Sequence, residues 1–280
     1  MRSIFTAFLL VLTTAHAASI WHVTGDQEYY LFGTIHVMKP ESYPLPKVYE
    51  EAFSQCDQLW LEIDQKEMED TALLLEAQKM MLLPAGEILD QQVSENSLNQ
   101  MKELAEIAGI NLGLFQGLKP WAAVNVLTLT VMQMQGFDVE RGLDEHLAGW
   151  AERDGIPTQG FESLLWQMRM LDNLGTTYTE EFIEFSTNEM DNVEQLVEQL
   201  VSYWQQGDVE SLYQQAAFEN YREIEQAMLT DRNNNWMGIL TNSPQQNSTV
   251  CVAVGALHMA GEFGLIEQFK QKGFQVKRLN

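Results

Sequence analysis

Two patterns of hydrophobic positions divide the chain into a strand-forming beginning and end and a helical middle. Short apolar runs bounded by turn residues predict strands at 20–24, 28–33, 58–64, 249–258 and 273–279. The run at 249–258 is the most apolar of these, as expected for the centre of a sheet that is covered on both faces. The first two runs flank the turn signal Gly25-Asp-Gln and are predicted to form a β-hairpin.

The region from 65 to about 241 has mostly helical spacing of its apolar residues. Predicted helices lie at 97–108, 118–135 and 142–155, a long helix passes through 231–236, and shorter helices are expected at 47–54 and 261–270. One short strand is predicted within this region, at 156–160. Together the elements predict an α/β (α+β) fold. In it, helices flank a mixed central β-sheet, and a large, mostly helical insertion separates the N-terminal and C-terminal sheet segments.

The first residues of the chain differ from the rest. A basic start, Met1-Arg-Ser, precedes the apolar run Ile4–Leu12 and the small-x-small pattern Ala15-His-Ala17. The run is too short to span a bilayer as a retained helix, although an interfacial anchor is an alternative. We therefore predict a signal peptide at 1–17 and a single domain at 18–280. The mature protein is expected to be secreted across the inner membrane, without a membrane span, and to be periplasmic where the cell has an outer membrane.

The charge balance excludes some kinds of partner. The 40 acidic and 16 basic residues give a formal net charge of −24. Binding to nucleic acid or to anionic lipid is disfavoured, because there is no basic patch to neutralise phosphates. The acidity is explained either by solubility in a saline milieu or by a preference for cationic peptides or metal ions near the surface.

The only two cysteines, Cys56 and Cys251, precede two predicted strands at similar offsets. Cys56 lies six residues before Glu62, and Cys251 lies seven residues before His258. If the two strands are parallel neighbours, the cysteines could form a disulfide in an exported protein. The alternative is two buried thiols that pack as small apolar groups, and the sequence does not choose between them.

Two short motifs at opposite ends of the chain suggest a common site. Leu31-Phe-Gly-Thr-Ile-His36 and Val252-Ala-Val-Gly-Ala-Leu-His258 are apolar runs that each end in Gly-x-x-His, in a chain with five histidines. A glycine allows a sharp backbone turn at a strand end, from which the histidine then projects. We therefore expect the fold to bring His36 and His258 together around one metal ion.

Glu62 is the third candidate, because acidic residues are depleted in strands and rarely buried without a partner. It lies between Leu61 and Ile63 near the carboxyl end of a predicted strand, which favours a role at a site. Asp64 has the same parity, but a solvated strand end is sufficient to explain it.

Five other polar residues have simpler explanations. His22 and His146 are expected to pack or to face solvent, and His146 lacks neighbours at ligand spacing. Asp144 and Glu162 lie near predicted helix starts, where acids interact favourably with the helix dipole. Arg232 is one of few cations in an acidic chain, and its simplest role is a surface ion pair of little energetic weight.

Several longer motifs recur in a specific order. They are Leu31-Phe-Gly-Thr-Ile-His36, Trp60-Leu-Glu-Ile, Arg141-Gly-Leu-Asp-Glu-His-Leu147, Gly160-Phe-Glu-Ser with Gln167, Tyr203-Trp-Gln-Gln-Gly-Asp208, Asp231-Arg-Asn-Asn-Asn-Trp236 and Val254-Gly-Ala-Leu-His-Met-Ala-Gly-Glu-Phe-Gly-Leu265. In these motifs the chain resembles the TraB/GumN family, also called Tiki-like, over essentially its whole mature length. The resemblance implies a mixed sheet with helices on both faces and a site at one edge of the sheet. Animal Tiki proteins are similar and are regarded as metal-dependent proteases, whereas bacterial members are linked to peptide-pheromone shutdown or are uncharacterised.

The resemblance also assigns residues to the site. The family's two histidines and its strand glutamate map onto His36, His258 and Glu62, and its arginine maps onto Arg232. Two imidazoles and one carboxylate suit a divalent metal ion with an open coordination position, such as Mn, Co or Zn. Glu62 is then either the third ligand or the general base, and Arg232 would stabilise the oxyanion. Asp144 could orient one of the histidines.

These residues predict a secreted or periplasmic metal-dependent hydrolase that acts as a peptidase on a peptide or protein substrate. The alternative is a non-catalytic peptide-, metal- or haem-binding protein of the same fold, because family membership alone does not guarantee catalysis. The chain contains no Gly-x-Ser-x-Gly, His-Glu-x-x-His or phosphate-binding loop. The usual serine-hydrolase, zincin and nucleotide-binding functions therefore lack support.

Overall fold

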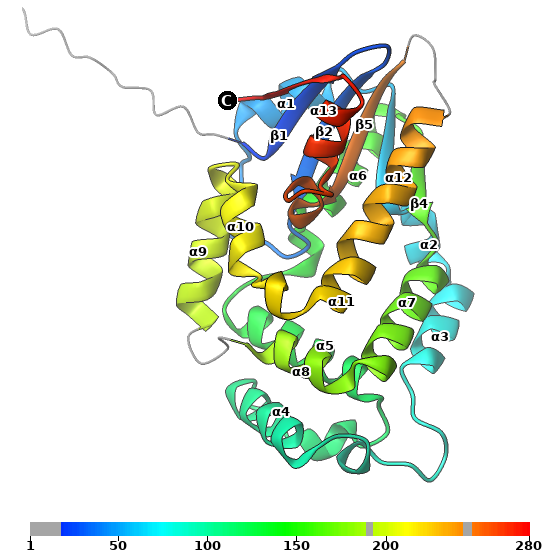
Figure 1. The fold of residues 1–280 in the computed structure, drawn as a ribbon, viewed down its shortest axis with the longest axis vertical. Helices are drawn as coiled ribbons and strands as arrows, with labels where there is room; N and C mark the ends of the chain where they lie inside the picture. The colour runs from blue at the N-terminus through cyan, green and yellow to red at the C-terminus, as the bar shows by residue number, and fades with distance from the viewer. Residues whose placement is uncertain (1–17, 189–192, 243–247) are drawn as a thin grey trace, which may run out of the picture.

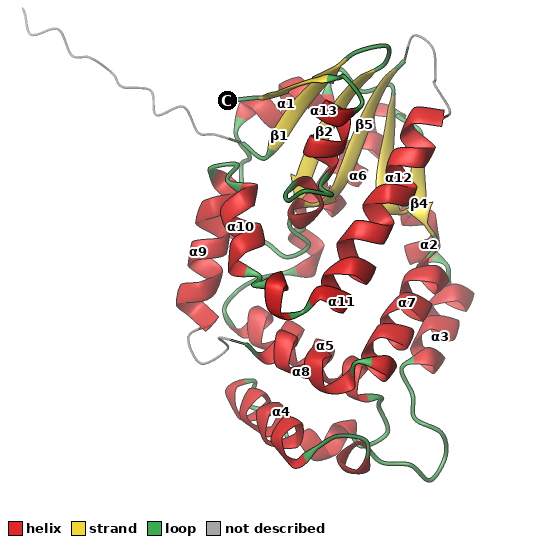
Figure 2. Ribbon diagram, viewed as in Figure 1, coloured by secondary structure: helices red, strands yellow, loops and turns green. Residues whose placement is uncertain are grey.

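The computed structural model describes residues 18–188, 193–242 and 248–280, so the predicted signal peptide lies outside the described residues. Their centre is one six-stranded mixed sheet in the order β4-β3-β5-β2-β1-β6 (Figure 1). The strands are β1 (Ile20–Thr24), β2 (Glu28–Thr34), β3 (Gln58–Ile63), β4 (Thr158–Glu162), β5 (Thr249–Gly255) and β6 (Gln275–Arg278). The predicted α/β fold with a mixed sheet is confirmed, and Figure 2 shows the strands gathered at one end of the molecule.

Strand direction brings four carboxyl ends to one edge of the sheet. The strands β2, β5, β3 and β4 are parallel, and in register Thr34 faces Gly255 while Ile63 faces Glu162. The first strand, β1, forms the predicted hairpin with β2 and also pairs antiparallel with β6. Since ligand sites of open α/β sheets lie beyond the carboxyl ends of parallel strands, this edge is where a site is expected.

Helices cover both faces of the sheet. In the view of Figure 1, α12 (Asp231–Asn242) and α13 (Leu265–Gln271) lie in front of the sheet, and α1 (Lys47–Phe53) and α6 (Leu143–Asp154) lie behind it. Side chains of β2 pack against the helices on both faces of the sheet. The ring centroid of Tyr29 lies 4.9 Å from that of Phe269 in α13, whereas the ring centroid of Phe32 lies 6.4 Å from that of Phe53 in α1. Burial on both faces explains why β5 is almost continuously apolar.

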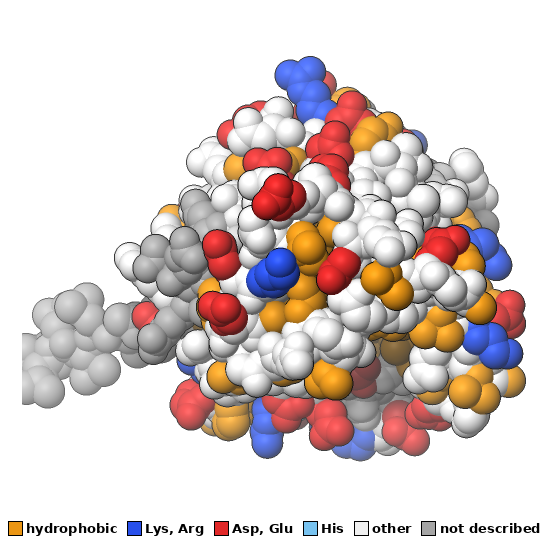
Figure 3. Space-filling model, turned by 90° about the horizontal axis from the view of Figure 1, so that it is seen from below, with side chains coloured by type: hydrophobic (Ala, Val, Ile, Leu, Met, Phe, Trp, Pro, Cys, Tyr) orange, Lys and Arg blue, Asp and Glu red, His pale blue; other side chains and the backbone are white. Residues whose placement is uncertain are grey.

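A mostly helical region occupies the chain between β3 and β5, as predicted, and is interrupted by β4. Its helices are α2 (Gln65–Glu69), α3 (Thr71–Met80), α4 (Glu95–Ile107), α5 (Pro120–Met134), α6, α7 (Leu164–Thr177), α8 (Thr179–Thr187), α9 (Val193–Gln205), α10 (Val209–Gln215), α11 (Arg222–Glu225) and α12. Several of these helices form a second hydrophobic core, which contains Met101, Trp121 and Ile183 and is distinct from the core around the sheet. Figure 3 shows the end of the molecule far from the sheet, where acidic side chains are scattered among hydrophobic ones. No helix of the described ranges is long and apolar enough to cross a membrane.

Three predicted boundaries near the sheet edge are wrong. The strand β5 ends at Gly255, and a 3-10 helix, Ala256–Met259, carries His258. The following helix begins only at Leu265, because Gly261 adopts a left-handed φ of 80° and the chain enters the helix at Gly264. The middle strand covers 158–162 instead of 156–160, which places Glu162 at its end.

Cys56 and Cys251 form a disulfide, with their Cα atoms 5.6 Å apart. Cys56 precedes β3 and Cys251 lies in β5. These two strands are parallel neighbours, and Leu59 faces Cys251 in register. Of the two alternatives that the sequence allowed, the structure therefore selects the disulfide. The disulfide links the residue that precedes β3 to a residue of β5 that lies 195 positions later in the chain.

Candidate functional site

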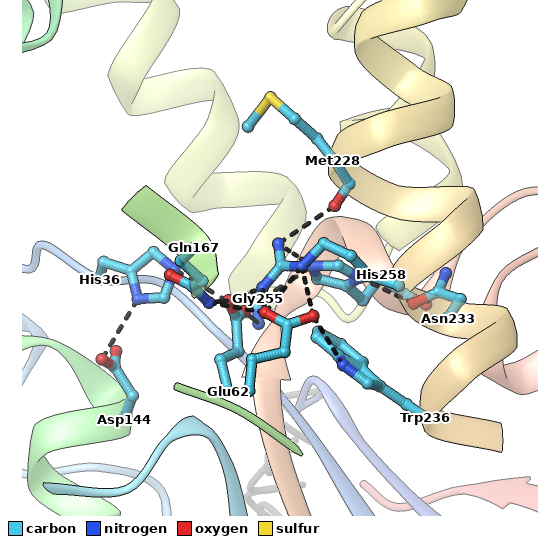
Figure 4. Close-up of polar contacts among 11 residues, drawn as sticks. His36, Glu62, Asp144, Gln167, Met228, Asn233, Trp236, Gly255 and His258 are labelled. Carbon is cyan, nitrogen blue, oxygen red and sulfur yellow. Dashed lines mark hydrogen bonds and ion pairs between the residues drawn. The ribbon is translucent and has the colours of Figure 1, made fainter. Parts of the chain in front are cut away.

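The three predicted ligands come together at the carboxyl edge of the sheet. His36 follows β2, Glu62 lies near the end of β3, and His258 lies just after β5 (Figure 4). Oε1 of Glu62 is 4.0 Å from Nε2 of His36 and 3.7 Å from Nε2 of His258. The two imidazole nitrogens therefore lie within the sum of these distances, below the separation of about 8 Å beyond which one shared ion becomes implausible.

Gly255 keeps the space between these side chains open. The motif glycines do not make left-handed turns, since φ of Gly255 is −46° and Gly33 is likewise outside the positive-φ region. The N–H of Gly255 donates to Oε1 of Glu62 at 2.9 Å. A methyl group on Gly255 would lie 3.4 Å from that oxygen and 3.7 Å from both His36 Nε2 and His258 Cδ2. These are ordinary contact distances, so a methyl group would fit but would occupy the space between the three side chains.

The imidazole of His258 is held in one tautomer. The side-chain N–H groups of Asn233 donate to the backbone oxygens of His258 (3.3 Å) and Phe263 (3.0 Å), which fixes the orientation of the amide. Its Oδ1 then accepts from Nδ1–H of His258 at 2.7 Å. The lone pair of Nε2 therefore points at Glu62 and Arg232. Burial, together with Arg232, lowers the pKa of His258 to about 3 against the attraction of Glu62, so the ring is neutral at neutral pH.

His36 is oriented by Asp144, which begins α6. Nδ1 of His36 lies 3.2 Å from Oδ2 of Asp144, in agreement with the predicted orienting role. The imidazole is 61% exposed, and this exposure is to the cavities described below. Desolvation opposes protonation, but the carboxylates of Asp144 and Glu62 outweigh it and raise the pKa of His36 to about 9.

Arg232 is buried at the place to which the resemblance assigns it, so the simpler alternative of a surface ion pair is excluded. The residue is 6% exposed, and its Nη2 donates to Glu62 at 2.6 Å and to Glu162 at 2.9 Å. Nε donates to Glu162 at 2.9 Å, and Nη1 donates to the backbone oxygen of Met228 at 3.1 Å and faces Nε2 of His258 at 3.3 Å. Burial favours a protonated Glu62, but the guanidinium and the two imidazoles outweigh it and lower its pKa well below the usual range.

Glu162 is the main residue that sequence reasoning missed. It had been explained by a helix dipole, but it ends β4, is 8% exposed and pairs with Arg232. It also accepts from Nε1 of Trp236 at 2.9 Å and from Nε2 of Gln167 at 3.0 Å. The available signal was its position directly after Phe161, at the end of a short strand and within the motif Gly160-Phe-Glu-Ser.

The motif Asp231–Trp236 supplies three buried side chains to the site. Arg232, Asn233 and Trp236 are buried on one side of α12, and the rings of Trp236 and His258 lie 4.4 Å apart. The helix follows a π-helical segment, Gln226–Thr230, a distortion that is frequent at functional sites. Asn233 and Trp236 were not singled out in the sequence, although both belong to this motif.

Comparison with known proteins gives one consistent result. The model of the TraB/PrgY/gumN family matches residues 19–278. The chain belongs to this family. It is similar to the uncharacterized protein YbaP of Escherichia coli (strain K12), with 26% identity over 257 residues that cover 88% of this chain and 89% of YbaP. It is equally similar to the uncharacterized protein YbaP of Shigella flexneri, and no solved structure matches.

The donor set of this TraB/PrgY/gumN chain suits a divalent metal in its chemistry. Nε2 of His258 directs a lone pair inward, and His36 can do the same once a metal ion displaces the proton that its raised pKa retains at neutral pH. The three carboxylates of Glu62, Glu162 and Asp144 exceed the positive charges of Arg232 and His36. Among the described residues, however, no three His, Cys, Asp or Glu side chains form a ready metal-binding group. The physical reason is that Arg232 contacts both Glu62 and His258 in this arrangement, so a metal ion would have to displace Nη1 from His258.

Two cavities meet at the site of this family member. One has a volume of about 280 Å³ and is lined by polar groups that include Gln65, Glu145 and Gln167; the other has about 480 Å³ and is mainly apolar. Both are lined by His36 and Glu62. A larger recess of about 780 Å³ lies between α7 and α11, but none of the three candidate ligands lines it. We therefore place the site at the two cavities that His36 and Glu62 line.

Proposed function

We propose that this protein is a metal-dependent hydrolase that acts as a peptidase. The observation that carries the proposal is the convergence of His36, Glu62 and His258 on the space that Gly255 leaves open. Membership of the TraB/PrgY/gumN family supports the choice of these residues, but the relatives named above are uncharacterized and supply no activity.

The residues of the chain would divide the work as follows. A divalent ion, for which we propose Mn, Co or Zn, supplies Lewis-acid polarisation and lowers the pKa of water. Asp144 and Asn233 hold the Nδ1 protons of the two histidines, so that both Nε2 atoms face the centre, and His36 would release its Nε2 proton when it binds the ion. Arg232 keeps Glu62 ionised, which makes its Oε1 available as the third ligand or as the general base.

Arg232 has one N–H group that could stabilise an oxyanion. Nε and Nη2 are held by carboxylates at 2.6 to 3.1 Å, whereas Nη1 faces its weakest acceptor, Nε2 of His258, at 3.3 Å. We propose that Nη1 is the donor that turns to the developing oxyanion when His258 takes its role as a ligand. The hydrogen bonds to Glu62, Glu162 and the backbone oxygen of Met228 then hold the guanidinium in place.

Metal binding and cleavage test this proposal together. Metal-free protein is titrated with Mn²⁺, Co²⁺ and Zn²⁺ in a calorimeter, and a peptide library is incubated with the protein with and without chelator. We expect one ion per chain, cleavage that the chelator abolishes, and loss of both in His36→Ala and His258→Ala.

Gly255→Ala is the most specific variant, because its methyl group fills the space between the ligands at distances of ordinary contact. It should fold normally and lose metal binding. Gly149→Ala in α6 is the matched control, since a methyl group there meets nothing within 4 Å, and it should bind and cleave like the wild type.

The same experiment separates catalysis from the non-catalytic alternative. Ion binding that depends on both histidines, without chelator-sensitive cleavage, would favour a peptide-, metal- or haem-binding protein. Cleavage that persists in both histidine variants would refute the proposal altogether.

We also propose that residues 1–17 are a cleaved signal peptide and that the mature protein is periplasmic. The disulfide between Cys56 and Cys251 supports export, because disulfides persist mainly in oxidising compartments. Fractionation of the source cells and mass spectrometry of the purified protein test this: we expect an N-terminus at Ala18 and recovery in the periplasmic fraction. An intact Met1 in a cytoplasmic fraction would contradict it.

A further inference from the structure

The two cavities that meet at His36 and Glu62 have opposite chemical character. The larger one is bounded by α5, α8, α9, α10 and the π-helical segment, and its wall is formed mainly by apolar side chains. These include Met132, Phe185, Leu200, Met228 and Leu257. Its volume of about 480 Å³ lies within the range of sites that hold ligands. It can take more than one large apolar side chain.

An unsatisfied hydroxyl group lies in the wall of this apolar cavity. Thr34 is 2% exposed, and its Oγ1 has no hydrogen-bond partner. A buried hydroxyl without a partner is costly, and such groups call for an explanation. Because Thr34 lies two residues before His36, a polar group of a ligand that passes the site could be its partner.

The smaller cavity is acidic, because the three carboxylates of Glu62, Asp144 and Glu145 line it against one basic side chain, His36. Oδ1 of Asp144 is buried without a partner, and Glu145 accepts only the amide of Gln65. Arg232 does not line this cavity and is engaged by Glu62 and Glu162. The cavity is therefore suited to a cationic group of the ligand.

The unsatisfied atoms support a common occupant. The described residues contain four buried side-chain oxygen atoms without a partner, and two of them, Thr34 Oγ1 and Asp144 Oδ1, belong to residues that line these two cavities. A lipid acyl chain would fill the apolar cavity but would leave both atoms unsatisfied. A peptide supplies apolar side chains, backbone hydrogen-bonding groups and a cationic side chain at once.

We propose that the substrate is a peptide that carries apolar side chains on one side of the scissile bond and a lysine or arginine on the other. The apolar side chains occupy the cavity that Thr34 lines, and the hydroxyl of Thr34 bonds to the peptide backbone. The basic side chain occupies the cavity of Asp144 and Glu145. This inference rests on the proposed peptidase function, but its test does not require cleavage.

The test measures peptide binding to metal-free protein by fluorescence anisotropy in the presence of chelator. Three labelled peptides serve as probes: one with three leucines followed by lysine, one with glutamate in place of the lysine, and one with serines in place of the leucines. We expect the first to bind about tenfold or more tightly than either of the others, since both cavities contribute to its binding.

Variants assign each contribution to its cavity. Thr34→Val should weaken binding of the leucine–lysine peptide by about 3- to 10-fold without loss of thermal stability, as expected for one lost hydrogen bond to a ligand. Glu145→Gln should reduce the preference for lysine over glutamate by about 2- to 5-fold. Glu140→Gln, an exposed residue outside both cavities, is the matched control and should change neither.

Blocking the apolar cavity gives the decisive outcome. Ala216→Phe, or Leu196→Trp if the first variant fails to fold, should abolish the advantage of leucine over serine. The proposal is overturned if a blocked variant binds the leucine–lysine peptide like the wild type, or if the three peptides bind equally. It is also overturned if a long-chain fatty acid binds and no peptide does. Peptide binding that follows this pattern without any cleavage by the metal-loaded protein would instead count against the peptidase function alone.

Discussion

Replacing Glu162 by glutamine tests whether the buried ion-pair cluster holds the site together. Glu162 accepts hydrogen bonds from Nε and Nη2 of Arg232, from Trp236 and from Gln167, all between 2.9 and 3.1 Å. Glutamine has the same shape but offers one acceptor oxygen and one NH₂ group. Whichever way the amide turns, its NH₂ group faces N–H donors, so Arg232 loses at least one of its hydrogen bonds to this side chain together with the negative charge that neutralises it.

The expected cost follows from burial. A buried hydrogen-bond donor without a partner costs about 1 to 3 kcal/mol, and more if it is charged. Removing one partner of a buried ion pair costs about 3 to 5 kcal/mol, because a buried charge is left uncompensated. Since Glu62 still neutralises Arg232 in part, we expect a loss of about 3 to 4 kcal/mol in the free energy of unfolding of Glu162→Gln. For a chain of this size that corresponds to a fall in Tm of about 6 to 16 °C.

Urea unfolding followed by circular dichroism measures this difference, with Glu267→Gln as the matched control. Glu267 pairs with Lys270 at 3.5 Å, but both side chains are largely exposed, so its loss should remain within about 0.5 kcal/mol. A loss below about 1 kcal/mol in Glu162→Gln would refute the reasoning, because Arg232 would then not depend on a second buried carboxylate.

Three further predictions concern the rest of the structure. Reduction of the disulfide should lower the free energy of unfolding by about 3 to 5 kcal/mol, because the crosslink closes a loop of 195 residues. Urea unfolding with dithiothreitol is compared with urea unfolding without it, and equal free energies of unfolding would contradict this prediction. Asp144→Asn and Asn233→Ala should weaken metal binding about 10- to 100-fold in calorimetry, whereas Asp70→Asn, which caps α3 and lines neither cavity, should not. The metal-free protein should lose stability as the pH falls from 6.5 to 3, because the fold lowers the pKa of His258. The lowered pKa of Glu62 adds to this loss of stability below pH 4.5. Unfolding midpoints that stay constant between pH 6.5 and 4 would contradict this prediction.

The positions of the three candidate metal ligands, His36, Glu62 and His258, could be predicted because the sequence signal of each is local. Each lies in or just after a short apolar strand, and parallel strands bring their carboxyl ends to the same edge of a sheet. Glu62 stood out by the same local rule, as an acid within an apolar strand. The convergence of His36, Glu62 and His258 follows from this topology, whereas the exact end of β5 could not be predicted from it.

The surroundings of the ligands could not be predicted in the same way. Asn233 acts on His258 from a helix 25 residues away in the chain, and nothing in an Asn-rich run marks the one amide that packs against the imidazole. Glu162 had a sufficient local explanation as an acid near a helix start. Its burial against Arg232 is a tertiary contact over 70 residues, which only the packing of α12 on the sheet reveals.

The position of Arg232 stabilises the site without a metal ion and is compatible with the proposed binding of one. In the described state its guanidinium supplies the positive charge that Glu62 and Glu162 require, so these carboxylates are not left unpaired in the core. The carboxylates hold Nε and Nη2, while Nη1 is the group directed at His258. A metal ion that binds Nε2 of His258 therefore competes with a single N–H contact and not with the whole cluster. In the proposed metal-bound protein, the hydrogen bonds to Glu62 and Glu162 would therefore keep Arg232 at the site.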